Sequence, residues 1–369
     1  MKRTTRRILF YSLALLFAVA GPLAVITSLG YSFRFSTATF ESTGGIFIKS
    51  DTARTSVFLN GAFVRETGFI TGSTLLTDVV PGTHLVRLEK QDYRPWSKTV
   101  AVSPAAVTEF RDVFLVPYLP SVATSSAEEV FSLRAERDAS NAENAMSFIF
   151  SMDKKNRLLI TESKKTRAVA ENVHSFTPTE QGAFFVGQNG FLASYDILLH
   201  EAQTIARPGF FLGREPFRFV RGDHFLAVVD SSGGLFLYDM ITTTMRPIAS
   251  GAKEIFFDSA EEKLLIVKEQ AIDILWLTDN PVQPFQKKDT VETVVQTDDL
   301  IREGRWYFET DRHVVFRTRH GVFIAETDTR GGANQSQLIS VPVDEIITSP
   351  LAPSAVFYRD GKALYKIEF

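Results

Sequence analysis

The segments Gly190-Phe-Leu-Ala-Ser-Tyr-Asp196 and Gly233-Gly-Leu-Phe-Leu-Tyr-Asp239 carry one pattern at positions 43 residues apart. The same offset pairs Phe176 with Phe219, and both are expected to be buried at equivalent strand positions. Tyr195 and Tyr238 are expected to match each other in burial, and weaker copies of the pattern follow further along the chain. A repeat of about 40–45 residues made of short strands is typical of a β-propeller blade. One such sheet cannot cover its own apolar faces, so neighbouring blades must stack on it. The repeat therefore predicts a propeller.

The propeller is expected to occupy residues 146–369. Apolar pairs that open a unit occur near residues 146, 176, 219, 255, 294 and 346, which predicts about six blades. The last unit, Asp344 to Phe369, is one strand short, and a strand from the N-terminal side, such as Val130–Leu133, would complete it. An extended β-solenoid or two sandwiches are the alternatives, and the constant offset favours the propeller. No signature names a propeller subfamily.

Residues 117–145 are rich in Pro, Ser, Ala and Glu and are interpreted as a linker. Before them, residues 45–116 contain about seven short strand patterns, as in an antiparallel sandwich. Asn60-Gly61 between apolar runs predicts a hairpin, because both central residues of a type I′ turn need a positive φ. Pro81-Gly82 predicts a second turn, with Gly82 at a positive φ.

The same stretch contains the motifs Gly44-x-Ile46-x-Ile48-x-Ser50, Val57-x-Leu-Asn-Gly61, Val80-Pro-Gly-Thr-His84-x-Val86 and the single residue Tyr93. In these motifs it resembles the PEGA domain, a small β-sandwich of exported bacterial and archaeal proteins. The Pro-Glu-Gly-Ala tetrapeptide that names the family is replaced around Asp51 to Thr55, and Asp92 stands where the family commonly has Gly. The resemblance implies an exposed spacer or binding unit without catalytic residues.

The N-terminus reads as a membrane anchor. Four basic residues precede Ile8 to Leu29, a run of 22 residues without a charge, whose helix would rise roughly 33 Å, about one hydrocarbon thickness. The positive charge of the short segment before this run predicts that the N-terminus stays in the cytoplasm and that the chain after the run is exported. Residues 1–31 are thus the cytoplasmic stub and anchor, and 32–44 a linker. A cleaved signal peptide with the A-x-A match Ala18-Val19-Ala20 is the alternative.

Composition removes several classes of function. The 369 residues contain 40 Lys and Arg against 43 Asp and Glu, a net charge of −3, so no basic surface for nucleic acid is expected. Cysteine is absent, which excludes disulfides, thiolate zinc sites and thiol catalysis. The surplus of Phe, 32 residues, fits the wedges between blades.

No motif of a hydrolase, nucleotide-binding loop or metalloprotease is present. Asp196 and Asp239 could be paired glycosidase carboxylates, but a recurring turn cap explains them better. His313 and His320 are expected on solvated strand ends. We therefore assign no catalytic, cofactor-binding or metal-binding residue and expect no cofactor.

These observations predict a mainly β protein: an N-terminal transmembrane helix, a small PEGA-like β-sandwich and a β-propeller of about six blades. The expected function is that of a single-pass, prokaryotic cell-membrane protein that displays a non-enzymatic binding or scaffolding module outside the membrane. Its expected partners are the membrane, through Ile8 to Leu29, and an envelope protein or glycan. The alternatives are an extracytoplasmic propeller hydrolase or lyase acting on cell-surface glycans, and a docking subunit of a membrane complex. Carboxylates clustered on the axial face would favour the enzyme, and a mixed aromatic and polar surface would favour binding.

Overall fold

The computed structural model describes residues 3–28, 31–34, 39–126, 148–162, 164–179, 181–207 and 209–369. The chain forms two compact units. Unit 1 contains Met1–Leu119 and two later segments, Asn280–Gln286 and Asp328–Ser336. Unit 2 contains Pro120–Asp279, Lys287–Thr327 and Gln337–Phe369.

Unit 1 begins with helix α1 (Arg3–Ser28), which has Pro22 in its interior. Within it, Thr5–Ile26 is the one candidate membrane span among the described residues, and its apolar side chains lie exposed. Strands β1 (Tyr31–Arg34) and β2 (Thr39–Ser42) then pair antiparallel, in residues that the sequence assigned mainly to a linker. The described chain therefore contains an apolar helix long enough to cross a bilayer.

A sandwich of two sheets follows, as predicted. One sheet has the order β6-β3-β9 and the other β5-β4-β7-β8. The prediction of a wholly antiparallel sandwich was wrong, because β3 and β9 run parallel; a long connection through the opposite sheet allows this. The strands are β3 (Gly44–Ser50), β4 (Ser56–Leu59), β5 (Ala62–Glu66), β6 (Ser73–Val79), β7 (Gly82–Glu89), β8 (Trp96–Val102) and β9 (Val107–Val113).

Alternation along these strands places one set of side chains in a shared core. Ile46, Ile48, Val57 and Trp96 are among its buried members. The predicted hairpin is present, because Asn60 and Gly61 have φ values of 52° and 84° between β4 and β5. Gly82 has a φ of 138°, so its predicted positive φ is also confirmed.

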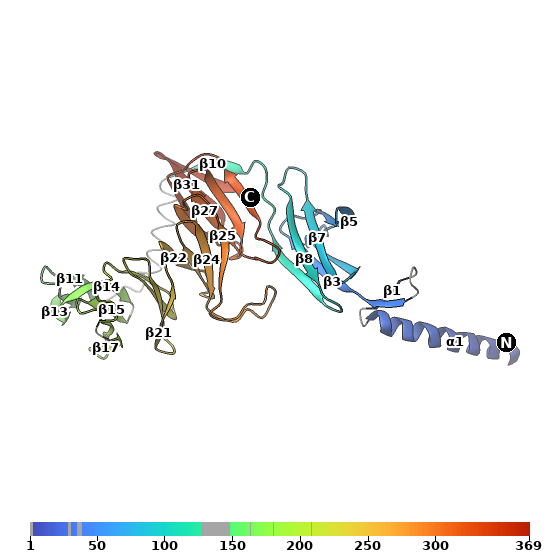
Figure 1. Ribbon diagram of the computed structural model, residues 1–369, viewed down its shortest axis with the longest axis horizontal. Helices are drawn as coiled ribbons and strands as arrows, with labels where there is room; N and C mark the ends of the chain where they lie inside the picture. The colour runs from blue at the N-terminus through green and yellow to red at the C-terminus, as the bar shows by residue number, and fades with distance from the viewer. Residues whose placement is uncertain are drawn as a thin grey trace. The chain divides into compact units, whose positions relative to one another are not determined.

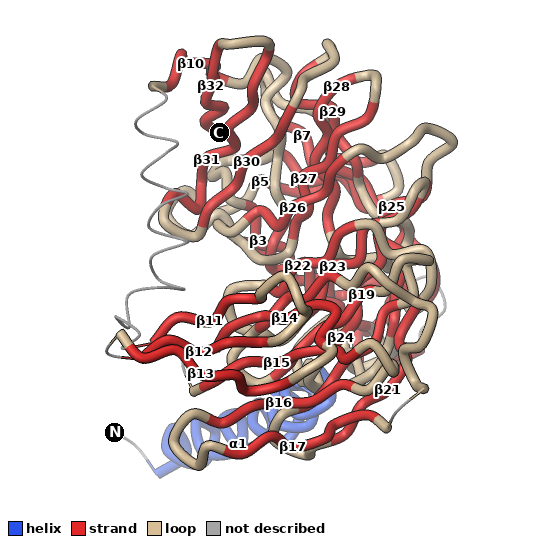
Figure 2. Tube along the Cα trace, turned by 90° about the vertical axis from the view of Figure 1, so that its left-hand side faces the viewer, coloured by secondary structure: helices blue, strands red, loops and turns tan. Residues whose placement is uncertain are grey.

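Unit 2 contains six small antiparallel sheets in the described residues, which succeed one another along the chain as propeller blades do (Figure 1). Figure 2 shows the described part of this unit as strands and loops, with the helix of the chain confined to α1. The first four sheets comprise β11 (Phe148–Met152), β12 (Leu158–Glu162) and β13 (Lys165–Ala170); β14 (Val173–Thr179), β15 (Gly182–Gly187), β16 (Leu192–Asp196) and β17 (Glu201–Ala206); β18 (Arg218–Arg221), β19 (Phe225–Val229), β20 (Leu235–Asp239) and β21 (Thr244–Ala249); and β22 (Glu254–Phe257), β23 (Lys263–Val267), β24 (Ala271–Trp276) and β25 (Val291–Gln296).

The last sheet closes with a strand from the N-terminal side of the unit, as predicted. The fifth sheet comprises β26 (Glu303–Tyr307), β27 (His313–Thr318), β28 (Gly321–Glu326) and β29 (Gln335–Ile339). The sixth has β30 (Glu345–Ser349), β31 (Ala352–Asp360) and β32 (Ala363–Glu368), and β10 (Ser121–Ser125) pairs with β32. The completing strand therefore lies inside the expected linker 117–145. Val130–Leu133, the segment suggested for this role, lies outside the described residues.

The 43-residue repeat is structural. The two quoted segments end in β16 and β20, the third strands of adjacent sheets. Phe176 pairs with Phe185, and Phe219 pairs with Val228, the residue 43 positions after Phe185. Both Phe176 and Phe219 are half-buried against apolar clusters, so their equivalence is confirmed, although their full burial was not found. Their sheets therefore share one register.

The predicted blade opening near residue 294 was wrong. The apolar pair near residue 294 belongs to β25, the last strand of the fourth sheet, and the fifth sheet opens at Glu303. The chain between Trp276 and Val291 is longer than the equivalent turns in the second and third sheets, which delays β25. The delay brings its valines to the place where an opening strand was expected.

The first sheet supplies three described strands. A β-bulge interrupts its β12–β13 pairing after Leu158. The bulges between the third and fourth strands of the next sheets follow Leu192 and Leu235. Strands β11, β12 and β13 therefore correspond to the second, third and fourth strands of a blade. The predicted blade opening near residue 146 was wrong for this reason, since the described strand that follows it, β11, is a second strand.

Apolar clusters join the sheets in chain order. One cluster joins β11–β12 to β14–β16, a second joins that sheet to β18–β20, and two more continue through β23–β25 to β26–β28. Phenylalanine rings contribute to the clusters around the third sheet, where Phe211 contacts Phe217 and Phe236 edge to face. Burial between neighbouring sheets is thus the main source of stability in unit 2.

Candidate binding pocket

The two aspartates at equivalent blade positions are turn caps, as the sequence indicated. Oδ1 of Asp196 accepts hydrogen bonds from the backbone N–H groups of Leu198 and Leu199. Oδ1 of Asp239 accepts them from Ile241 and Thr242, at the same turn of the next sheet. Each carboxylate is thus held in its own turn.

The expectation for His313 was wrong. Its side chain is buried, at 4% exposed, and Nδ1 lies 2.9 Å from Oγ1 of Thr310. His320 is exposed as expected and contacts Asp299 at 3.1 Å. His313 opens β27, whose residues are nearly all buried, so the density of apolar neighbours outweighed its polarity. In the described ranges, no group of three or more His, Asp or Glu side chains is arranged to hold a metal.

An open pocket of about 910 Å³ lies at one end of the third and fourth sheets. Four segments of these sheets meet there: the start of β18, the β19–β20 turn, the β23–β24 turn and the connection from β21 to β22. Successive turns of an antiparallel sheet alternate between its ends, which is why these loops meet. Polar or charged side chains reach the pocket from Arg218, Asp230, Ser231, Ser232, Lys253, Lys268, Glu269 and Gln270, and the rest of its lining is Pro216, two alanines and two glycines.

The carboxylate of Asp230 is fully occupied within this pocket. Oδ1 accepts hydrogen bonds from Ser232 N, Ser232 Oγ and Gly234 N, and Oδ2 accepts one from Arg214 Nη1 at 2.9 Å. Burial by itself would raise the pKa of Asp230, but the hydrogen bonds from Ser232, Gly234 and Arg214 outweigh it and hold the pKa below its usual value. Asp230 is therefore an ionised turn cap.

Two lysines of the pocket have acidic partners. Nζ of Lys253 lies 3.2 Å from Oε1 of Glu269, whose side chain is 69% exposed. Nζ of Lys268 lies 2.7 Å from Oδ2 of Asp273, which is buried. The first pair is a surface ion pair of little strength, whereas the second is anchored in the sheet.

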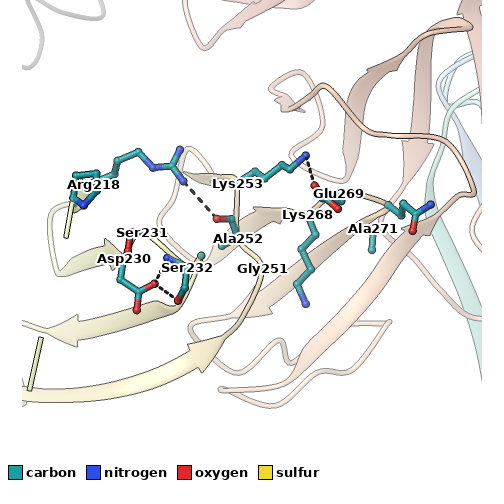
Figure 3. A pocket seen from close by; sticks show the side chains of 13 residues that line it. Arg218, Asp230, Ser231, Ser232, Gly251, Ala252, Lys253, Lys268, Glu269 and Ala271 are labelled. Carbon is teal, nitrogen blue, oxygen red and sulfur yellow. Dashed lines mark hydrogen bonds and ion pairs between the residues drawn. The ribbon is translucent and has the colours of Figure 1, made fainter. Parts of the chain in front are cut away.

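Arg218 differs from both lysines. Its guanidinium donates one long hydrogen bond, 3.4 Å, to the carbonyl oxygen of Ala252, and it forms no ion pair with the described residues. Figure 3 shows Arg218 directed toward Ala252 and Lys253 directed toward Glu269. Arg218 therefore contributes a positive charge that no described carboxylate neutralises.

The charge at this position is not required by the repeat. Arg218, Glu254, Glu303 and Glu345 each open the first strand of their sheets. The three glutamates pair with arginines of the unit: Glu254 with Arg305 at 2.8 Å, Glu303 with Arg317 at 2.8 Å and Glu345 with Arg359 at 3.2 Å. Among these four sheets, the third is the one whose first strand begins with a positively charged residue instead of a glutamate. Sequence reasoning missed Arg218, although an alignment of all blade openings would have shown the reversal.

A second pocket of about 550 Å³ lies at the other end of the second and third sheets. The equivalent tyrosines Tyr195 and Tyr238 line it and are 4% and 7% exposed, which confirms their predicted match in burial. Arg167 Nη2 donates to the Tyr195 hydroxyl at 2.6 Å. Burial, and then the charge of Asp239, raise the pKa of Tyr238, which keeps its hydroxyl protonated. The lining of this second pocket includes both aromatic and polar side chains.

Unit 1 holds a buried cation of a different kind. The side chain of Lys98 is fully buried, and its Nζ donates to the carbonyl oxygen of Asp328. Arg330 makes an ion pair with Asp328 at 2.6 Å and lies over the ring of Phe110. Its Nη1 and Nη2 also donate to Gln283 Oε1 and to the carbonyl oxygen of Glu109. This network is internal to the unit, and its role is structural.

Comparison with known proteins agrees with the predicted PEGA-like sandwich. Residues 43–114 match the PEGA domain family. No curated protein matches the chain. The similar solved structures include the β-propeller domain of Cps50 (Swd1) from Myceliophteria thermophila, at 10% identity over 61% of this chain and 94% of that one, with a TM-score of 0.33. An oligogalacturonate lyase in complex with manganese has 11% identity, coverages of 60% and 74%, and a TM-score of 0.36. These low scores add nothing to the assignment, which rests on the sheet topology.

Proposed function

We propose that this protein is a membrane-anchored, extracytoplasmic binding or scaffolding protein without catalytic activity. The observation that carries the proposal is the apolar span Thr5–Ile26, followed by a PEGA domain and propeller-like sheets. An uncleaved helix behind basic residues would hold the N-terminus in the cytoplasm and display both β units outside. The display of a pocket-bearing propeller beyond the membrane suits the recognition of an envelope component.

The state of the pocket acids supports binding rather than hydrolysis. General acid–base catalysis needs a carboxyl group that is free to exchange a proton with the substrate. In the larger pocket, Asp230 has both oxygens occupied by donors, and Glu269 is a largely exposed surface carboxylate. Neither environment resembles that of a carboxyl group tuned for proton transfer.

The test is the fate of the N-terminus. The full-length protein is expressed in a bacterium, and its membranes are washed with alkaline carbonate. We expect the protein to stay in the membrane fraction with Met1 or Lys2 at its N-terminus. We also expect external protease to digest both β units in spheroplasts. A mature N-terminus at Gly21 together with a soluble protein would overturn the anchored form, and protection from external protease would overturn the extracytoplasmic location.

A further inference from the structure

We infer that the 910 Å³ pocket binds a saccharide that carries an anionic group, with Arg218 and Lys253 as its anion-binding residues. This inference rests on the proposed binding function and names the class of ligand. It starts from size and polarity, since pockets of roughly 300–1,000 Å³ are typical of small-ligand sites. The lining offers hydroxyl and amide groups from Ser231, Ser232 and Gln270, which can hydrogen-bond to sugar hydroxyl groups.

The arrangement of charged side chains in the pocket indicates that the ligand carries an anionic group. Asp230 is neutralised by Arg214, and Lys268 by the buried Asp273. Arg218 has no carboxylate partner among the described residues, so its guanidinium can hold a carboxylate or phosphate with two parallel hydrogen bonds. A guanidinium placed at the edge of a polar pocket is suited to such a ligand.

Lys253 can join Arg218 because its present partner is weakly held. Glu269 lies on the exposed β23–β24 turn, and its ion pair with Lys253 is worth about 0–1 kcal/mol. An arriving ligand anion would replace Glu269 as the partner of Lys253. Glu269 therefore competes with the ligand, and this competition gives the inference a sharp test.

The experiment is isothermal titration calorimetry on the detergent-solubilised full-length protein with three probes. Hyaluronan tetrasaccharide carries carboxylates, mannose 6-phosphate carries a phosphate, and chitotetraose is neutral. We expect at least one anionic probe to bind about tenfold more tightly than chitotetraose. Preference between the two anionic probes identifies the carboxylate or the phosphate as the group recognised.

Four variants locate the binding. Arg218→Ala and Lys253→Ala should each weaken binding of the anionic probe by about tenfold. Glu269→Gln should strengthen it several-fold, because the variant removes the competitor. Arg246→Ala is the matched control, since Arg246 lies in the same sheet and pairs with Asp289 outside the pocket. Thermal unfolding checks that every variant is folded.

Three outcomes would overturn the inference: equal affinity for anionic and neutral probes, no loss in Arg218→Ala, or an equal loss in Arg246→Ala, which would indicate a net-charge effect. None of these outcomes bears on membrane anchoring or on export. The failure of the pocket assignment and the failure of the proposed function are therefore distinguishable.

Discussion

The Nζ atom of Lys98 lies 3.5 Å from Oδ1 of Asp328, a residue 230 positions further along the chain. The lysine side chain is fully buried within unit 1, beside the ring of Phe110. A buried charge is tolerated only when it is paired and hydrogen-bonded, so the sandwich depends on a segment that the sequence places far away.

Lys98→Ala should therefore destabilise unit 1 by about 3–5 kcal/mol, because it leaves the charge network without its buried cation. The fluorescence of Trp96, the tryptophan of this unit, follows unfolding in urea. Lys49→Ala is the matched control, since Lys49 is an exposed lysine of the same unit and its loss should change stability by less than about 0.5 kcal/mol. Similar losses for both variants would contradict the structural role given to Lys98.

Asp328 predicts a pH dependence of the same unit. Burial would raise its pKa, but the hydrogen bonds from Arg330 and the charges of Lys98 and Arg330 outweigh burial and lower the pKa. A carboxyl group with a lowered folded pKa stabilises the fold above its unfolded pKa, about 3.9. That stabilisation is lost as the pH falls from about 4 through the folded pKa. Urea titrations of Asp328→Asn should show a flatter loss of stability over this acidic range than the natural protein shows.

Gly82→Val should cost about 1–3 kcal/mol, because a φ of 138° is unfavourable for a residue with a branched side chain. No atom lies within 4 Å of the added Cβ position, so backbone strain and not a clash is the expected cause. Urea denaturation measures the loss, with the neighbouring exposed strand position Thr83→Val as the control. A loss below about 0.5 kcal/mol would mean that the turn tolerates an ordinary residue.

The shared register of the second and third sheets predicts matched effects. Phe176→Ala and Phe219→Ala should each cost about 1–3 kcal/mol, because both rings are half-buried. Phe185→Ala removes a ring that is 1% exposed and should cost about 3–5 kcal/mol. Thermal unfolding of the three variants gives the comparison. Clearly unequal losses at Phe176 and Phe219 would argue against their equivalence.

The closing strand β10 gives the last prediction. Among the described strands of its sheet it pairs with β32 alone, so alternate N–H groups face β32 and the opposite edge. Proline removes an N–H, and it is tolerated where that group faces solvent. Of the two variants Val122→Pro and Ala123→Pro, we therefore expect one to lower the free energy of unfolding by about 3 kcal/mol and the other to change it little. The fluorescence of Trp276 and Trp306 reports on this unit, and two equally harmless variants would mean that β10 does not close the sheet.

Much of the fold could be predicted because its causes are local. The uncharged run Ile8 to Leu29, the positive φ required at Asn60-Gly61, and the 43-residue repeat each express a property of neighbouring residues. The capping role of Asp196 and Asp239 was predictable for the same reason, since each carboxylate bonds to N–H groups two and three positions away.

The sequence by itself thus determined the membrane-length helix, the sandwich and the succession of blades, through hydrophobic periodicity and turn chemistry. Only the tertiary structure decided which distant residues meet: β3 beside β9, β10 beside β32, Lys98 against Asp328, and the loops that bring Arg218 to Lys253. The burial of His313 and the isolation of Arg218 were decided in the same way. Burial and charge pairing depend on neighbours in space, and local patterns along a chain do not specify those neighbours.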